Sequence, residues 1–158
     1  MDKQKIINMY NMQSHPEGGY FAETYRSELL VDTSSGKRNA STAIYFLITK
    51  NSISHFHRLK SDEGWHFYLG DPLKIIEITP SRELIETIMG PSLNLGHKSQ
   101  YFVPAGHWFA STSLGDYSFV GCTVSPGFDF KDFEMGKKKD LSDKFPNMNE
   151  ILDMYCLD

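Results

Sequence analysis

One short stretch of this sequence, SHFHRLKSDEGWHFYLG at residues 54–70, contains most of the side chains that could do chemistry. If residues 54–59 are extended, His55 and His57 project from the same face, because side chains alternate along a strand. Two imidazoles on one face can bind a divalent metal, and the carboxylate of Glu63 can complete a facial set. The stretch predicts a metal or polar-ligand site, or else a solvent-facing strand with incidental histidines.

Strand parity separates the remaining side chains of this stretch. If Glu63 points inward, Trp65 does so too, whereas His66 and Tyr68 point to the other face. His66 joins Glu63 only if a β-bulge shifts the register, and is otherwise a hydrogen-bonded structural histidine. A histidine such as His57 can abstract a proton near neutral pH, and a hydroxyl such as that of Tyr68 can return one. The candidate catalytic residues are therefore His57, Glu63, His66 and Tyr68.

Four further side chains are candidates for ligand binding: Glu23, Arg26, Trp65 and Trp108. Arg26 could present its planar guanidinium to a carboxylate or phosphate of a ligand, or it could be an ion-pair partner at a barrel rim. Glu23 and Arg26 fall on opposite faces of an ideal strand, which argues against a simple ion pair between them. Trp65, Tyr68 and Trp108 could stack on a sugar or base, although aromatic residues at strand spacing more often fill a core.

The rest of the sequence predicts the strands that would position these residues. The start, DKQKIINMYNMQ, has helical spacing over about residues 3–13, and HPEGG ends that helix. STAIYFLIT and the later apolar runs are short, rich in β-branched and aromatic residues, and bounded by turn residues. About seven or eight strands with short connections predict an all-β barrel or double-sheet jelly roll. Helical spacing returns in the C-terminal tail.

Composition excludes several classes of protein. A chain of 158 residues fits one domain, 1–158. A net charge of −4, with no basic cluster beyond residues 137–139, argues against nucleic-acid and anionic-membrane partners. No run approaches the roughly 18 apolar residues of a membrane span, and the start lacks a signal-peptide pattern, so we expect a cytoplasmic protein. Cys122 and Cys156 lack CxxC spacing and predict two reduced thiols.

Two motifs carry a resemblance to a known superfamily. The pattern of His55, His57, Glu63 and Gly70 resembles the first motif of the cupins, with a gap about one residue longer than the common form. Pro104-Ala105-Gly106 in VPAGHWFAS resembles the second cupin motif. Phe109 stands where a metal-binding cupin has its last histidine, and His107 is a possible substitute. Five blocks in order, over about residues 14–135, are similar to a family of small single-domain (RmlC-like) cupins without a settled reaction.

The resemblance implies a double-stranded β-helix, the cupin jelly-roll barrel, with a pocket inside it and often a homodimer. The aromatic GFDFKDF segment, at residues 127–133, would offer an edge for a second copy. With the fourth ligand missing, any divalent metal at His55, His57 and Glu63 would be weakly bound, and other cofactors stay unknown. The expected ligand is a small polar metabolite, such as a sugar or sugar nucleotide. It would be isomerised or epimerised, or else sensed without chemistry.

Overall fold

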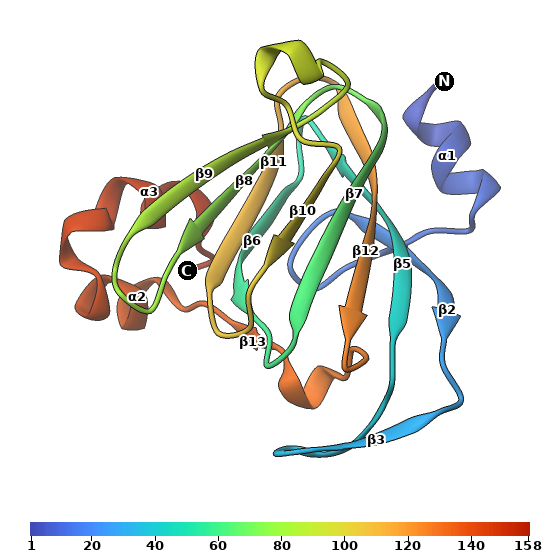
Figure 1. Cartoon of the computed structure of the whole chain (residues 1–158). Coiled ribbons are helices and arrows are strands. Elements are labelled where there is room, and N and C mark those ends of the chain that lie inside the picture. Colours follow the sequence, from blue (N-terminus) through green and yellow to red (C-terminus); the bar gives the residue numbers. More distant parts are fainter.

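The computed structural model describes residues 1–158 and consists mainly of two antiparallel sheets that face each other (Figure 1). The larger sheet has the order β1-β2-β5-β12-β7-β10. Its strands are β1 (Gln13–Ser14), β2 (Tyr20–Arg26), β5 (Thr42–Thr49), β7 (Asp62–Gly70), β10 (Gln100–Val103) and β12 (Tyr117–Ser125). This arrangement confirms the predicted all-β jelly roll.

The second sheet has the order β13-β6-β11-β8-β9. Its strands are β6 (Ile53–Arg58), β8 (Leu73–Ile78), β9 (Leu84–Met89), β11 (Trp108–Ser113) and β13 (Glu134–Met135). A separate hairpin, β3 (Leu30–Thr33) with β4 (Gly36–Asn39), projects from the body of the barrel (Figure 1). Single 3₁₀ turns occur at η1 (Leu93–Leu95), η2 (Phe130–Asp132) and η3 (Pro146–Met148).

Short helices lie at both ends of the chain, as the sequence predicts. They are α1 (Lys3–Met9), α2 (Lys138–Lys144) and α3 (Asn149–Tyr155). The side chain of Asp2 caps α1 by accepting a hydrogen bond from the Gln4 backbone N–H. Helix α1 ends earlier than predicted because Asn11 has a positive φ of 49° and the chain then enters β1. No helix has the length and apolar character needed to cross a membrane.

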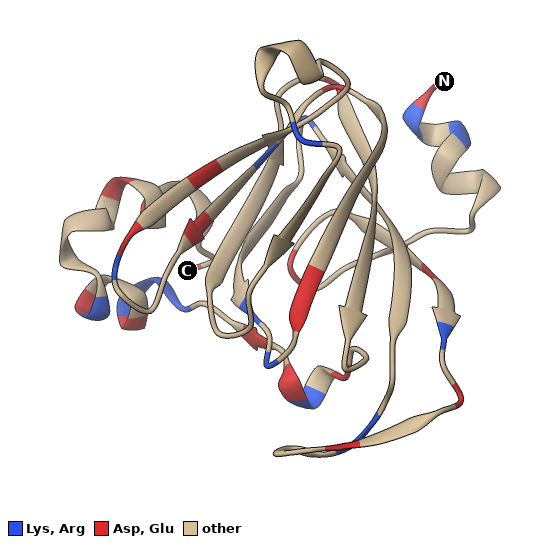
Figure 2. Cartoon of the chain, in the orientation of Figure 1, with Lys and Arg blue, Asp and Glu red and all other residues tan.

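Alternation along the strands divides the apolar residues between three cores. In β8, Ile75 points between the two sheets, whereas Ile76 and Ile78 point outward against the C-terminal helices. The inner core includes Phe46 and Trp65, both about 1% exposed. Helix α1 covers a third cluster on the outer face of the larger sheet. Figure 2 shows Lys and Arg scattered among Asp and Glu at strand ends and on helices.

The segment after β12 folds across one end of the barrel instead of forming an extended arm. Its η2 turn is held by Arg38, whose guanidinium donates hydrogen bonds of 2.7 and 3.0 Å to Asp132. Only Glu134–Met135 pairs with the sheet, at the edge beside β6. No residue of the GFDFKDF segment, 127–133, therefore belongs to the apolar edge strand that the sequence suggests.

Candidate functional site

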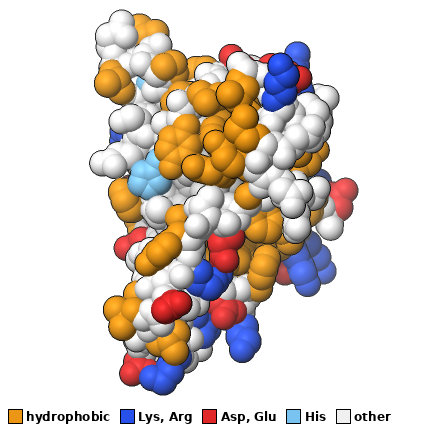
Figure 3. All heavy atoms as spheres, turned by 90° about the vertical axis from the view of Figure 1, so that its right-hand side faces the viewer, with side chains coloured by type: hydrophobic (Ala, Val, Ile, Leu, Met, Phe, Trp, Pro, Cys, Tyr) orange, Lys and Arg blue, Asp and Glu red, His pale blue; other side chains and the backbone are white.

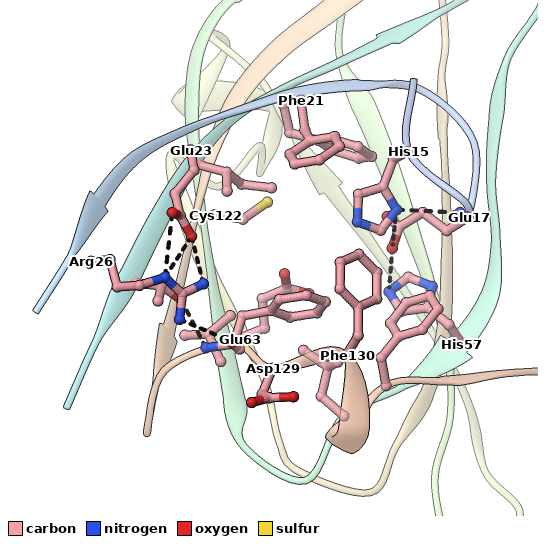
Figure 4. A pocket seen from close by; sticks show the side chains of 17 residues that line it. His15, Glu17, Phe21, Glu23, Arg26, His57, Glu63, Cys122, Asp129 and Phe130 are labelled. Atoms are coloured by element: carbon pink, nitrogen blue, oxygen red, sulfur yellow. Dashed lines mark hydrogen bonds and ion pairs between the residues drawn. The ribbon is translucent and has the colours of Figure 1, made fainter. Parts of the chain in front are cut away.

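A cavity of about 410 Å³ lies inside the barrel, between β2, β5 and β6 and beneath the segment that contains η2 (Figure 4). Its walls are mainly apolar, and five of the lining residues are phenylalanines: Phe21, Phe46, Phe128, Phe130 and Phe133. Eight polar or charged side chains also line it: His15, Glu17, Glu23, Arg26, Thr42, His57, Glu63 and Asp129. Such a concave, mostly apolar space with a few convergent polar groups is typical of a small-molecule site.

The polar centre of the cavity is a group of three side chains in contact: His15, Glu17 and His57. Oε2 of Glu17 lies 3.3 Å from Nδ1 of His15 and 3.1 Å from Nε2 of His57. The hydroxyl of Ser54 donates a 2.7 Å hydrogen bond to the other oxygen of Glu17. Figure 4 shows these histidines gathered around Glu17 on one side of the cavity.

Hydrogen bonds indicate which atoms of this group carry protons. Nδ1 of His57 is 2.7 Å from the carbonyl oxygen of His55, which can only accept, so Nδ1 carries the proton of the neutral ring. Nε2 of His57 is then a lone pair facing Glu17. Burial lowers the pKa of His57 to about 4 and raises the pKa of Glu17. Both shifts favour the shared proton on Glu17, which then donates a hydrogen bond to Nε2 of His57.

His15, the third member of this group, has a neutral imidazole ring. The backbone N–H of Glu17 donates to its Nδ1 at 3.2 Å, which places the ring proton on Nε2. Burial lowers the pKa of His15, so the neutral form is favoured. Nε2–H of His15 has no partner within the protein and is free to donate to a ligand.

Two local irregularities of the backbone bring these side chains together. The HPEGG turn places Gly18 and Gly19 at φ values of +109° and +77°, a region that favours glycine, and returns Glu17 toward β6. In β6, Ser54 pairs with Ser111 of β11 and His57 pairs with Phe109. The three-residue interval in β6 therefore lies opposite a two-residue interval in β11, which is a β-bulge. The bulge turns both Ser54 and His57 toward Glu17.

Glu63 reaches the cavity from β7. Its Oε2 accepts a 3.2 Å hydrogen bond from Nε1 of Trp65, whereas Oε1 has no partner within the protein. Burial raises the pKa of Glu63 well above its usual range, and the nearby carboxyl of Glu17 raises it further. Cys122 is a buried free thiol in the same wall, and burial raises its pKa as well. Both cysteines are unpaired in this structure.

The structure corrects the prediction that Glu23 and Arg26 do not pair. Nη2 of Arg26 lies 2.6 Å from Oε1 of Glu23. The register of β2 against β5 shifts between Glu23 and Tyr25, so a bulge brings both side chains to the cavity face. Nη1 of Arg26 also donates to Asn39 and to the carbonyl oxygen of Phe128, which joins β2 to the segment above the cavity.

The predicted metal set of His55, His57 and Glu63 is not assembled. The β6 bulge removes His55 from the cavity, and its Nδ1 contacts the backbone carbonyl of Glu17 at 2.7 Å. The ring of Phe109 packs on His57 with centroids 4.2 Å apart, at the place where a fourth ligand would lie. No group of three or more His, Cys, Asp or Glu side chains is placed to hold a metal ion. These residues do not fit a metal centre.

Two predicted catalytic residues, His66 and Tyr68, lie on the outer face of the larger sheet. Nε2 of His66 is 2.9 Å from the hydroxyl oxygen of Thr123, and Tyr68 is 50% exposed. Although β7 has a register shift against β12, it falls between Phe67 and Leu69 and leaves His66 outside. The parity argument was correct, and the catalytic role expected for these two residues does not fit their positions.

The two tryptophans are core residues and do not line the cavity. Trp65 belongs to the inner core and meets the site only through its hydrogen bond to Glu63. Trp108 packs in the outer core, with the guanidinium of Arg58 4.6 Å above its ring. His107 binds Glu77 at 3.0 Å and does not substitute for the missing ligand at the cavity.

Sequence reasoning missed His15 and Glu17. Both lie in the HPEGG stretch, where the proline and glycines indicate a turn, and two titratable residues beside such a turn were the available signal. Their partner His57 lies about forty residues further along the chain, so their meeting depends on how the turn packs against β6.

The fold and the interior cavity define the class of protein: this is a cupin barrel. The chain matches the family model described as Cupin superfamily (DUF985) over residues 4–136, and it belongs to that family.

Relatives of the whole chain support this assignment. An uncharacterized protein of Saccharomyces cerevisiae is 33% identical over 154 residues, covering 87% of this chain and 76% of the yeast protein. A hypothetical protein from Leishmania major is 35% identical, with a TM-score of 0.95 over 100% of both chains. A protein from Shewanella oneidensis is 37% identical, with a TM-score of 0.93 over 99% of this chain and 98% of that one.

A more distant likeness concerns the fold alone. Oxalate decarboxylase from Bacillus subtilis has a TM-score of 0.58 and 11% identity, over 90% of this chain and 36% of that one.

Proposed function

We propose that this chain binds a small carbonyl-bearing metabolite in the barrel cavity and moves a proton on it, as an isomerase or epimerase does. A sugar is the case that the resemblance suggests. The observation that carries the proposal is the 3.1 Å contact between Glu17 and His57 beside a second buried carboxyl, Glu63, in one cavity. Titratable groups whose environments shift their pKa values in opposite directions are typical of acid–base sites.

The proposed chemistry begins at Glu63. Its raised pKa makes its carboxylate a stronger base than an ordinary one, able to take a proton from a carbon next to a carbonyl. Nε2–H of His15 would donate to the oxygen as it becomes an enolate. The proton shared by Glu17 and His57 would then go to the carbon from another side. One proton is taken and one is returned, so substrate and product are isomers.

The alternative is a binding or sensing module without turnover. The apolar walls and the closure of the cavity by the η2 segment would serve such a module equally well. The two functions differ in a single observable, the exchange of a carbon-bound hydrogen with solvent.

Hydrogen exchange in D₂O, followed by proton NMR, tests the proposal. The two probes are dihydroxyacetone, a sugar-like carbonyl, and acetophenone, an apolar one. We expect the protein to accelerate exchange next to the carbonyl of at least one probe, and Glu63→Gln to reduce that acceleration by about 10²-fold or more. Glu86→Gln, at an exposed carboxylate on β9, is the matched control and should keep the full rate. Binding of a probe without any exchange would favour the sensing module.

We also propose a homodimer, on different grounds from those in the sequence. Tyr10, Tyr45, Tyr68 and Phe119 form a continuous aromatic cluster on the outer face of the larger sheet, with neighbouring ring centroids 4.5–6.0 Å apart. Figure 3 shows hydrophobic side chains gathered on part of the face that it presents. A second copy could cover such a surface.

Light scattering at micromolar concentration tests the dimer. We expect the mass of two chains for the unmodified protein and of one chain for Tyr68→Glu, because the substitution places a charge in the centre of an apolar contact. Leu95→Glu, at a 73% exposed position on the η1 turn, should leave the dimer intact. A single-chain mass for the unmodified protein would contradict the proposal.

A further inference from the structure

Phenylalanines make up five of the nine apolar residues that line the cavity. Phe128, Phe130 and Phe133 from the segment above the cavity contact one another with ring centroids 4.9–6.0 Å apart. They also surround the ring of His15, which lies 5.8 Å from Phe133 and 6.1 Å from Phe130. Phe21 and Phe46 complete the wall. Ring faces and edges offer good packing to a flat apolar molecule and little to a set of hydroxyl groups.

The cavity has no cation free to bind an anionic ligand. Arg26 is the only Lys or Arg in its lining. The guanidinium has five N–H donors, and four of them are used: Nε and Nη2 donate to Glu23, and Nη1 donates to Asn39 and to the carbonyl oxygen of Phe128. A phosphate or carboxylate would therefore have to displace Glu23 to bind the guanidinium through two donors, and it would also meet the carboxyl groups of Glu63 and Asp129.

The deep polar groups offer a cation little negative charge. Glu17 and His57 share one proton, burial favours the neutral form of His15, and burial disfavours the ionised form of Glu63. A cationic ligand would lose its hydration there and would be paired only with carboxyl groups whose ionised form is itself disfavoured by burial, which is unfavourable.

Few polar atoms of the deep site lack a partner. Nε2–H of His15 is a free donor, and Oε1 of Glu63 is a free carboxyl oxygen. The donor of His15 can hold one carbonyl oxygen, with Oε1 of Glu63 beside the neighbouring carbon, whereas each hydroxyl of a sugar requires a partner of its own when it is buried.

We infer that the cavity takes an uncharged, mainly apolar carbonyl compound, with its flat body between the phenylalanines, its oxygen toward His15 and the neighbouring carbon toward Glu63. This inference rests on the proposed proton transfer for the position of the carbonyl group. It replaces the sugar nucleotide expected from the sequence with a ligand that carries neither phosphate nor several hydroxyls.

Binding of four probes of similar or smaller size tests the inference: acetophenone, benzoate, benzylammonium and dihydroxyacetone. Calorimetric titration at neutral pH should give a dissociation constant for acetophenone at least about tenfold below those of the other three. Phe130→Ala should weaken acetophenone binding by a similar factor, because the ring covers the mouth of the cavity. Phe102→Ala is the matched control, since Phe102 and Phe130 are both 55% exposed but Phe102 lies outside the cavity lining.

Each result separates this inference from the proposed function. Acetophenone that binds tightly but exchanges no deuterium would support the ligand class and contradict the proton transfer. Exchange of dihydroxyacetone without acetophenone binding would support the proton transfer and overturn the ligand class. A preference for benzoate or benzylammonium, or the absence of acetophenone binding, would overturn the ligand class as well.

Discussion

Gly18→Ala is expected to destabilise the protein by about 2–4 kcal/mol and to abolish binding in the cavity. Gly18 has a φ of +109°, which disfavours any residue with a Cβ atom, and a Cβ placed there would overlap the carbonyl oxygen of Ile53 in β6. The chain would have to move the HPEGG turn away from β6. Glu17 would then lose its contacts with Ser54 and His57.

A second glycine provides the control for this prediction. Gly106 also has a positive φ, +82°, but a Cβ placed there meets no atom within 4 Å. Gly106→Ala should cost only the intrinsic penalty of the left-handed backbone, about 1–2 kcal/mol, and should keep ligand binding. Urea unfolding measures the difference in stability, and titration with acetophenone measures binding. Equal effects of the two substitutions would show that the turn does not depend on its close contact with β6.

Glu63→Gln is expected to stabilise the protein at alkaline pH by about 1–3 kcal/mol, although it should abolish the proposed chemistry. The folded state raises the pKa of Glu63, so above the unfolded-state pKa the native protein retains a proton that the unfolded chain releases. Stability therefore falls as pH rises from the unfolded pKa through the folded one. Glutamine resembles the protonated carboxyl and can still accept from Nε1 of Trp65, so the variant should lack this slope.

Unfolding measured against pH tests this prediction. The two proteins should be nearly equally stable in acid, below the unfolded-state pKa of Glu63, and should diverge as pH rises. His57 has the opposite effect on the pH dependence of stability, and it has this effect in the unmodified protein and in the variant alike. Its folded pKa of about 4 lies below the unfolded value, so its contribution is complete above the unfolded pKa and is lost as pH falls toward 4. A variant that is less stable than the unmodified protein at alkaline pH would show that Glu63 is needed as an anion.

The sequence by itself determined the strands, the fold class and part of the site. Short apolar runs bounded by turn residues are typical of buried strands, so β5, β8 and β12 could be located, and the spacing of His57 and Glu63 predicted that both face the interior. The same parity placed His66 and Tyr68 on the outer face. The two cupin-like motifs then distinguished one barrel among the possible all-β folds.

Only the tertiary structure decided which side chains meet. Parity holds for regular strands, and the bulges in β2 and β6 break it, joining Arg26 to Glu23 and removing His55 from the cavity. Those bulges depend on pairing with distant strands, so the local pattern does not reveal them. Glu17 comes from a turn rather than a strand, and its contact with His57 forms because that turn packs against β6. The chemistry of the site therefore depends on contacts between segments that are far apart in the sequence, whereas the barrel depends on periodicity within each segment.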